Sequence, residues 1–128
     1  MLAYIMVGTN NVKRAAKFYD AALAPLGLVQ TGMDTRYVGY GPKNAPAKSQ
    51  FYVTKPYNKK TATFGNGTMI ALAAKSKKAV DGFYAAALAN GGTNEGKPGP
   101  RPADGTNYTA YVRDLDGNKI CAYCAKAK

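Results

Sequence analysis

Two cysteines near the C-terminal end have the spacing of thiol pairs that bind metal or undergo redox reactions. Cys121 and Cys124 form a C-x-x-C pair, which is typical of zinc and redox sites. However, residues 118–124 (NKICAYC) are predicted to form a strand, in which side chains three positions apart face opposite sides. The two thiols therefore cannot bind one metal ion together. We expect either small buried thiols or, at Cys121 alone, a thiol that faces a pocket.

The chain contains no histidine, so it lacks the residue that most often acts as a general base or metal ligand. A catalytic cysteine is usually activated by such a neighbour, which argues against nucleophilic chemistry at Cys121. A lysine or a helix N-terminus could still lower its pKa. Asp114 and Asp116 are interpreted as turn formers, because an aspartate side chain bonds its own backbone in such turns.

Tyrosines and arginines are the remaining candidates for binding. A tyrosine on a strand either fills the core or offers an apolar ring and a hydroxyl to a ligand. Arginine offers a two-pronged donor to carboxylate or phosphate, although solvent exposure is the alternative for each arginine. Arg101 lies in a segment rich in Pro and Gly and is a candidate for gating a ligand. The strand tyrosines are Tyr4, Tyr37, Tyr40, Tyr52, Tyr108, Tyr111 and Tyr123, and the arginines are Arg36, Arg101 and Arg113.

A repeated decapeptide divides the chain into two modules. Residues 18–27 read FYDAALAPLG, and residues 83–92, which begin 65 positions later, read FYAAALANGG. Self-similarity at a fixed offset indicates a duplicated structural unit. We expect a single domain over residues 1–128, with module 1 at about 1–64 and module 2 at about 65–128.

Each module is predicted to contain a strand, a helix and about three further strands. A strand near residues 93–97 is needed to complete module 2, although 93–106 otherwise reads as a long polar loop with three Pro and three Gly. The pattern predicts an α+β fold, with two tandem βαβββ modules forming a concave mixed sheet. The predicted strands are 3–8, 28–33, 36–40, 49–54, 68–74, 107–113 and 118–124, and the helices follow Asn10 or Asn11 and Ser76.

The net charge of +11 favours neutral or anionic partners. The lysines are scattered over loops and helix faces without a dense stripe or a known binding motif, which argues against nucleic acid as a partner. No apolar run is long enough to span a membrane. The first residues, MLAYIMVGTNN, lack the features of a secretory signal, so we expect a cytoplasmic location.

Two segments, YIMVGTNNVKRAAKFYDAALAPLG near the start and RDLDGNKIC near the end, resemble the vicinal oxygen chelate superfamily. This superfamily includes glyoxalase I, bleomycin resistance proteins and extradiol dioxygenases. With the internal repeat, the resemblance covers the whole chain. It implies a small-molecule site in the sheet concavity, and it implies a homodimer, because members often complete their pocket across a dimer.

The metal site of that superfamily does not carry over to this sequence. Counting from the shared motifs puts Tyr4, Met69 and Cys121 at three of the ligand positions, and the fourth falls near Gln50 or Tyr52. This set lacks the histidines and carboxylates that hold divalent iron, manganese, nickel or zinc. We therefore expect neither a metal nor another cofactor.

The resulting hypothesis is a metal-free protein that binds a small organic molecule in the sheet concavity. The predicted ligand-binding residues are Tyr4, Tyr37, Tyr52, Met69, Arg101, Tyr111 and Cys121, and no catalytic residue is predicted. The alternative is a glyoxalase-type lyase or isomerase, or a dioxygenase, that holds a metal through non-standard ligands. A third hypothesis, ranked below these, is an interaction or nucleic-acid-associated protein driven by charge.

Overall fold

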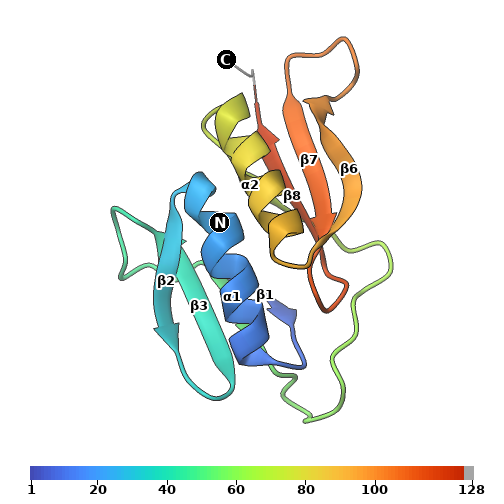
Figure 1. The fold of residues 1–128 in the computed structure, drawn as a ribbon. Coiled ribbons are helices and arrows are strands. Elements are labelled where there is room, and N and C mark those ends of the chain that lie inside the picture. Colours follow the sequence, from blue (N-terminus) through green and yellow to red (C-terminus); the bar gives the residue numbers. More distant parts are fainter. Residues whose placement is uncertain (126–128) are drawn as a thin grey trace.

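The computed structural model describes residues 1–125 and arranges them as two βαβββ units in tandem (Figure 1). β1 and β5 begin 65 positions apart, as do α1 and α2, which is the offset of the repeated decapeptide. The predicted two-module α+β architecture is therefore confirmed. The first unit comprises β1 (Ile5–Gly8), α1 (Val12–Leu23), the 3-10 helix η1 (Ala24–Leu26), β2 (Leu28–Met33), β3 (Tyr37–Pro42) and β4 (Phe51–Thr54). The second comprises β5 (Ile70–Ala73), α2 (Lys77–Ala89), β6 (Thr93–Pro100), β7 (Tyr108–Arg113) and β8 (Lys119–Cys124).

Each unit folds its strands into a mixed four-stranded sheet, in the orders β1-β4-β3-β2 and β5-β8-β7-β6. The first strand of each unit pairs in parallel with the last, and the other neighbours are antiparallel. A parallel pair needs a long crossover connection, which the helix provides in part. β1 and β5 are edge strands, and Val7 and Ile70 line one small crevice of about 20 Å³ between them.

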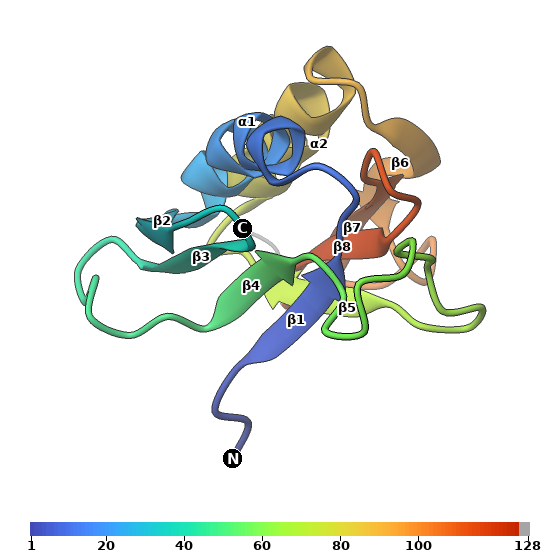
Figure 2. The same cartoon turned by 90° about the horizontal axis from the view of Figure 1, so that it is seen from below.

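Both helices cover the same side of the molecule and leave the other side of the sheets open (Figure 2). Asn11 caps α1 by accepting a hydrogen bond from the Arg14 backbone N–H at 2.9 Å, and Ser76 caps α2 by accepting one from Ala79 at 3.1 Å. The helices bury an apolar stripe against the sheets, with Phe18 and Phe83 fully enclosed. Within residues 1–125, neither helix is long and apolar enough to cross a membrane.

Alternation along the strands decides which side chains face the helices. In β4, Phe51 and Val53 are buried in the core, so Tyr52 lies on the opposite face. In β8, Cys124 belongs to the core beneath the helices, whereas Cys121 lies on the open face. The two thiols therefore point apart, as the C-x-x-C spacing within a strand predicted.

The segment 93–106 is less of a loop than its composition predicted. Residues 93–100 form β6, and only the part from Arg101 to the start of β7 is irregular. β6 is an edge strand that pairs only with β7, so Pro98 and Pro100 cost the sheet no central hydrogen bond. Its pairing also shifts register on both sides of Gly96. The prediction of a long loop over 93–106 was wrong, and the strand near 93–97 was correct but longer.

Candidate functional site

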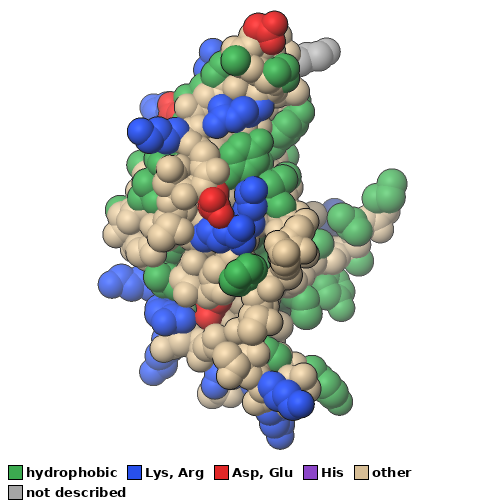
Figure 3. Space-filling model, turned by 90° about the vertical axis from the view of Figure 1, so that its right-hand side faces the viewer, with side chains coloured by type: hydrophobic (Ala, Val, Ile, Leu, Met, Phe, Trp, Pro, Cys, Tyr) green, Lys and Arg blue, Asp and Glu red, His purple; other side chains and the backbone are tan. Residues whose placement is uncertain are grey.

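The sheet face opposite the helices carries large apolar side chains that reach solvent. The exposed fractions are 55% for Tyr4, 53% for Met6, 42% for Met69 and 37% for Tyr123. Hydrophobic side chains gather along the right-hand edge of Figure 3, on the side turned away from the helices. An exposed apolar face of this kind is typical of a ligand or protein contact surface.

Three tyrosines form a cluster on the open face of the first sheet. The ring centroid of Tyr52 lies 5.2 Å from that of Tyr4 and 5.8 Å from that of Tyr37, and both contacts are edge-to-face. Gly39 makes room for the central ring, because a Cβ there would lie 3.0 Å from a ring carbon of Tyr52. The sequence predicted all three tyrosines as site residues, and the fold brings them together.

A cavity of about 380 Å³ opens beside two of these rings. A volume near 300 Å³ is at the small end of the range for small-molecule sites. Arg36 and Asp34 give the cavity one polar end. Its walls are Met6, Asp34, Arg36, Tyr37, Tyr52 and Thr54, and we call it the tyrosine pocket.

The polar end of the tyrosine pocket is held by local hydrogen bonds. The Arg36 guanidinium donates to the carbonyl oxygen of Pro56 at 3.1 Å. Asp34 accepts from the backbone N–H groups of Arg36 at 2.7 Å and Tyr37 at 3.1 Å. Because these bonds fix the turn between β2 and β3, Arg36 lies beside the tyrosines before any ligand arrives.

A second group of predicted residues lies on the other sheet. The Arg101 guanidinium carbon is 5.7 Å and the Lys119 Nζ is 5.5 Å from the ring centroid of Tyr111. Such cation–π contacts are attractive and orient the charged groups over the ring. Arg101 also donates to the carbonyl oxygens of Lys97 at 2.8 Å and Pro100 at 3.1 Å. Arg101 is thus folded back along β6.

Cys121 is buried, with an exposed fraction of 1%. Burial raises the pKa of its thiol from 9.0 to about 11, against a smaller lowering by the charges of Lys119 and Arg101. The Sγ atom points to the Ala122 carbonyl oxygen at 3.5 Å. At neutral pH this sulfur is a protonated thiol, which is a weak nucleophile and a weak metal ligand.

The strand registers identify the fourth position that the sequence left open between Gln50 and Tyr52. Cys121 pairs with Ala71, and Tyr52 pairs with Met6. Since Ala71 and Met6 are 65 positions apart, Tyr52 is the counterpart of Cys121 in the first unit.

The four positions therefore hold two phenols, a thioether and a protonated thiol. These donors do not fit a divalent metal of the kind that the resemblance implies. Within residues 1–125 no three His, Cys, Asp or Glu side chains come close enough together to hold a metal ion. The four residues are Tyr4, Tyr52, Met69 and Cys121.

Three further residues singled out in the sequence have internal partners, whereas Tyr123 is exposed on the open face. Tyr40 is fully buried, and its hydroxyl donates to Asp20 at 2.8 Å, with the Ala16 carbonyl oxygen as a second, more distant acceptor at 3.3 Å. Tyr108 donates to Asp81 at 2.7 Å. Arg113 forms an ion pair with Glu95. These contacts support the fold, which was the alternative left open for the two tyrosines, whereas the alternative for Arg113 was solvent exposure.

The predicted site residues thus fall into two groups. Tyr37 and Tyr52 line the tyrosine pocket, and Tyr4 packs against Tyr52. Tyr111 and Cys121 lie on the second sheet, and Arg101, directly after β6, lies over the Tyr111 ring. Met69 lies just outside β5. The sequence prediction omitted Asp34, Met6, Thr54 and Lys119. Met6 and Thr54 could have been found from strand alternation, because they follow Tyr4 and Tyr52 by two positions.

Comparison with known proteins agrees with this architecture. The sequence-family model of the glyoxalase/bleomycin resistance protein/dioxygenase superfamily matches residues 1–122 of this chain. A glyoxalase/bleomycin resistance protein from Albidiferax ferrireducens T118 is similar, with 42% identity over 95% of this chain and 96% of that one and a TM-score of 0.84. No match was found among curated proteins.

More distant structures share the fold. A glyoxalase-related enzyme from Fulvimarina pelagi has a TM-score of 0.72 at 17% identity, covering 97% of this chain and 87% of that one. A glyoxalase/bleomycin resistance protein/dioxygenase family enzyme from Burkholderia phytofirmans PsJN has a TM-score of 0.69 at 17% identity. The match covers 97% of this chain and 98% of that one. At these identities the likeness concerns the fold alone.

Proposed function

Because this chain belongs to the glyoxalase/bleomycin resistance protein/dioxygenase superfamily, we propose that it binds a small organic molecule without a metal. The observation that carries the proposal is the tyrosine pocket of about 380 Å³, with aromatic walls and Arg36 at its polar end. Binding of this kind requires shape, apolar surface and a few polar groups. The four positions that would hold a metal carry donors unsuited to it, so chemistry on the ligand is not part of the proposal.

The pocket favours a neutral or anionic aromatic ligand. Tyr37 and Tyr52 offer ring surfaces, and the Arg36 guanidinium offers charge-assisted donors to a carboxylate. Asp34 also lines the pocket, but its Oδ1 already accepts two backbone hydrogen bonds. The net charge of +11 opposes a cationic ligand.

A thermal-shift screen with aromatic carboxylates tests the proposal. A ligand at about 100 times its Kd stabilises the folded state by about 2.7 kcal/mol, which raises the Tm by several degrees. We expect Tyr52→Ala to abolish this rise. Tyr57→Ala is the matched control, because Tyr57 is 98% exposed on the connector after β4 and should keep the full rise.

Two outcomes would count against metal-free binding. The first is that no aromatic or carboxylate ligand raises the Tm of the unmodified protein. The second is a stoichiometric metal in the purified protein that Cys121→Ala removes, which would favour the alternative of a metal-dependent lyase, isomerase or dioxygenase with non-standard ligands.

We also propose that the open face is covered by a second copy of the chain. Tyr4, Met6, Met69 and Tyr123 are all more than one-third exposed on that face, and burying them between two copies would remove this apolar surface from water. A two-fold dimer is the commonest way to bury one patch on both partners. A cytoplasmic location is part of the proposal, and the two free cysteines are compatible with a reducing compartment.

A further inference from the structure

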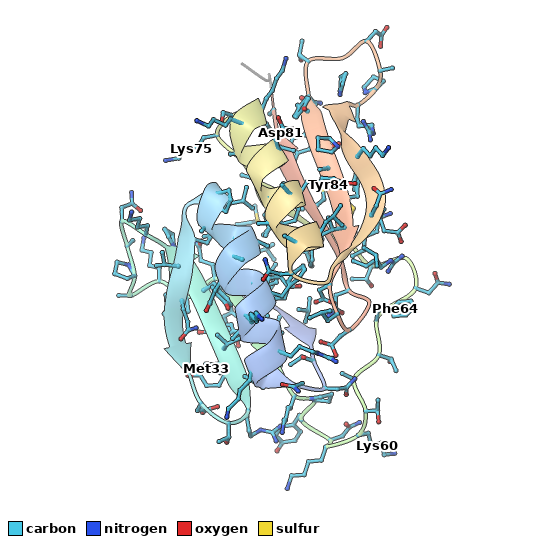
Figure 4. All side chains as sticks on the ribbon, viewed as in Figure 1. Met33, Lys60, Phe64, Lys75, Asp81 and Tyr84 are labelled. Atoms are coloured by element: carbon cyan, nitrogen blue, oxygen red, sulfur yellow. The ribbon has the colours of Figure 1, made fainter. Side chains whose placement is uncertain are left out.

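A second cavity, which shares only Arg36 with the tyrosine pocket, is lined by positive charge. It has a volume of about 350 Å³ and lies between the β2–β3 turn and the connector that follows β4. Lys60 marks this end of the molecule in Figure 4. Four of its eight lining residues are cations and none is acidic. The lining residues are Thr9, Asn10, Arg36, Lys55, Pro56, Lys59, Lys60 and Thr61, and we call this cavity the basic pocket.

The lysines of the basic pocket form no ion pair within residues 1–125, and Asp34, a carboxylate that lines a neighbouring cavity, is engaged by two backbone N–H groups. The two ion pairs among residues 1–125 are Arg14–Asp116 and Arg113–Glu95, so Lys55, Lys59 and Lys60 have no carboxylate partner there. Asp116 lies beneath Thr9, but its side chain is only 3% exposed and is engaged by Arg14. Like charges held together repel one another, and an anion between them would relieve that repulsion.

The walls of the basic pocket are fixed by hydrogen bonds. The Asn10 side chain accepts from the Ala62 N–H at 2.7 Å and donates to the Ala62 carbonyl oxygen at 3.2 Å. Arg36 holds the Pro56 carbonyl oxygen, and the Lys60 N–H donates to the Asn58 side chain at 3.0 Å. The loop that carries the lysines is therefore anchored at both ends, so a ligand would not have to order it.

The backbone of Lys59 has a left-handed conformation, with φ of +63°. Side chains other than those of Gly, Asn and Asp rarely adopt this conformation. It belongs to the turn closed by the hydrogen bond from the Lys59 N–H to the Pro56 carbonyl oxygen at 3.0 Å. Within residues 1–125 no other non-glycine residue has a positive φ, so a lysine occupies a position where a glycine would fit with less strain.

We propose that the basic pocket binds the phosphate groups of a small ligand, such as pyrophosphate or a nucleoside diphosphate. Phosphate offers several acceptor oxygens and about two negative charges, which match lysine ammonium groups and the Thr61 hydroxyl. The cavity volume suits one small ligand. Arg36 lines both cavities, but the basic pocket lacks aromatic walls and takes a different class of ligand from the tyrosine pocket.

Isothermal titration calorimetry of the full chain with sodium pyrophosphate tests this site. We expect saturable one-to-one binding that weakens as salt rises. Lys55→Gln/Lys60→Gln should weaken it at least about tenfold, since each charged hydrogen bond contributes on that order. Lys43→Gln/Lys48→Gln is the control, because it removes the same charge from the exposed turn between β3 and β4 and should change affinity less than about twofold.

Chemical-shift mapping on the unmodified protein keeps the test independent of variant folding. Pyrophosphate should shift the backbone amides of Lys59, Lys60 and Thr61 and leave those of β8 unchanged. A parallel titration with a nucleoside diphosphate shows whether the nucleoside adds affinity beyond that of inorganic pyrophosphate. Tyr52→Ala should leave pyrophosphate binding intact, which separates this site from the proposed function.

Several results would overturn the proposal. They include an absence of saturable binding at millimolar pyrophosphate, an equal loss of pyrophosphate affinity in the two double-lysine variants, and amide shifts confined to other parts of the chain. Tighter binding of duplex DNA than of pyrophosphate, with the same amides shifted, would also overturn it, because the pocket would then be part of a nucleic-acid surface.

Discussion

Tyrosine has two different roles in this chain, and the surroundings of its hydroxyl decide which. Tyr19 is fully buried and donates to Asp114 at 2.6 Å, so burial and then the nearby carboxylate raise its pKa well above 10.0. Tyr40 has a raised pKa for the same reasons, with Asp20 as its partner. Tyr37 and Tyr52 have no such carboxylate partner in the described part of the chain, residues 1–125, and their rings line a cavity. The first pair stabilises the fold, and the second is available for a ligand.

Cys121 leads to a prediction about alkaline pH. Its folded pKa of about 11 lies above the ordinary value of 9.0, so between these values the unfolded chain loses a proton that the folded chain keeps. The associated stability is present below about pH 9 and is lost as pH rises towards 11, with an upper limit of about 3 kcal/mol. Urea unfolding between pH 8 and 11 should show this loss.

Cys121→Ala is the comparison for that titration. Every other titratable group is common to the two proteins, so only the difference between the two stability curves reports the thiol. We expect the variant to lose less stability than the unmodified protein above about pH 9. Parallel curves would contradict the assigned shift.

At the level of elements, the turn between β7 and β8 joins the two units. Asp116 accepts hydrogen bonds from the Thr9 hydroxyl at 2.6 Å, the Asn10 N–H at 3.0 Å and the Arg14 guanidinium at 3.2 Å. Asn118 donates to the Gly8 carbonyl oxygen at 2.8 Å. The turn therefore docks on the corner between β1 and α1, and the closing motif of the sequence contributes to module assembly.

Asp114 should be the most costly residue of this turn to remove. It accepts from the Tyr19 hydroxyl, the Asn118 side chain and two backbone N–H groups, and Asp114→Ala leaves these buried donors unpaired. We expect a loss of about 3 kcal/mol in the free energy of unfolding, against about 1 kcal/mol for Tyr19→Phe. Chemical denaturation measures both values.

A double variant and a surface control test whether the Asp114–Tyr19 hydrogen bond accounts for this loss of stability. Asp114→Ala/Tyr19→Phe should lose less than the sum of the single losses, because both changes remove the same hydrogen bond. Asp104→Ala, in the exposed loop between β6 and β7, should change stability by no more than about 0.5 kcal/mol. Strict additivity would mean that the Asp114–Tyr19 bond does not form in solution.

The whole molecule has one covered side and one open side. α1 and α2 shield one face of both sheets, whereas the other face leaves tyrosines and methionines in solvent (Figure 2). Residues 1–125 of a single chain contain no further helix or strand with which to cover that face. The apolar surface therefore supports both proposals for it, a ligand in the tyrosine pocket and a second copy across the sheets.

Dimerisation can be tested by the mass of the particle in solution. We expect light scattering coupled to size exclusion to give twice the chain mass of 13.5 kDa. Met69→Asp and Tyr123→Asp should each shift the mass towards the monomer, because burying an unpaired carboxylate in an apolar contact costs several kcal/mol. Tyr57→Asp, on the exposed connector, should leave the mass unchanged. A monomeric unmodified protein would contradict the proposal.

The sequence by itself determined the duplicated architecture, the two helices with caps at Asn10 or Asn11 and at Ser76, and the opposite orientation of Cys121 and Cys124. These features depend on repeat offset, helix periodicity and strand alternation, which are local or internally repeated signals.

Tertiary structure alone decided which distant residues meet. Strand pairing selected Tyr52 over Gln50 as the counterpart of Cys121, and β6 became a strand because its prolines lie at a sheet edge. Folding also brought Arg36 to both the tyrosines and the lysines after β4. The hydrophobic pattern of a strand fixes which face is buried, but which distant strand it pairs with depends on contacts between segments far apart in the chain.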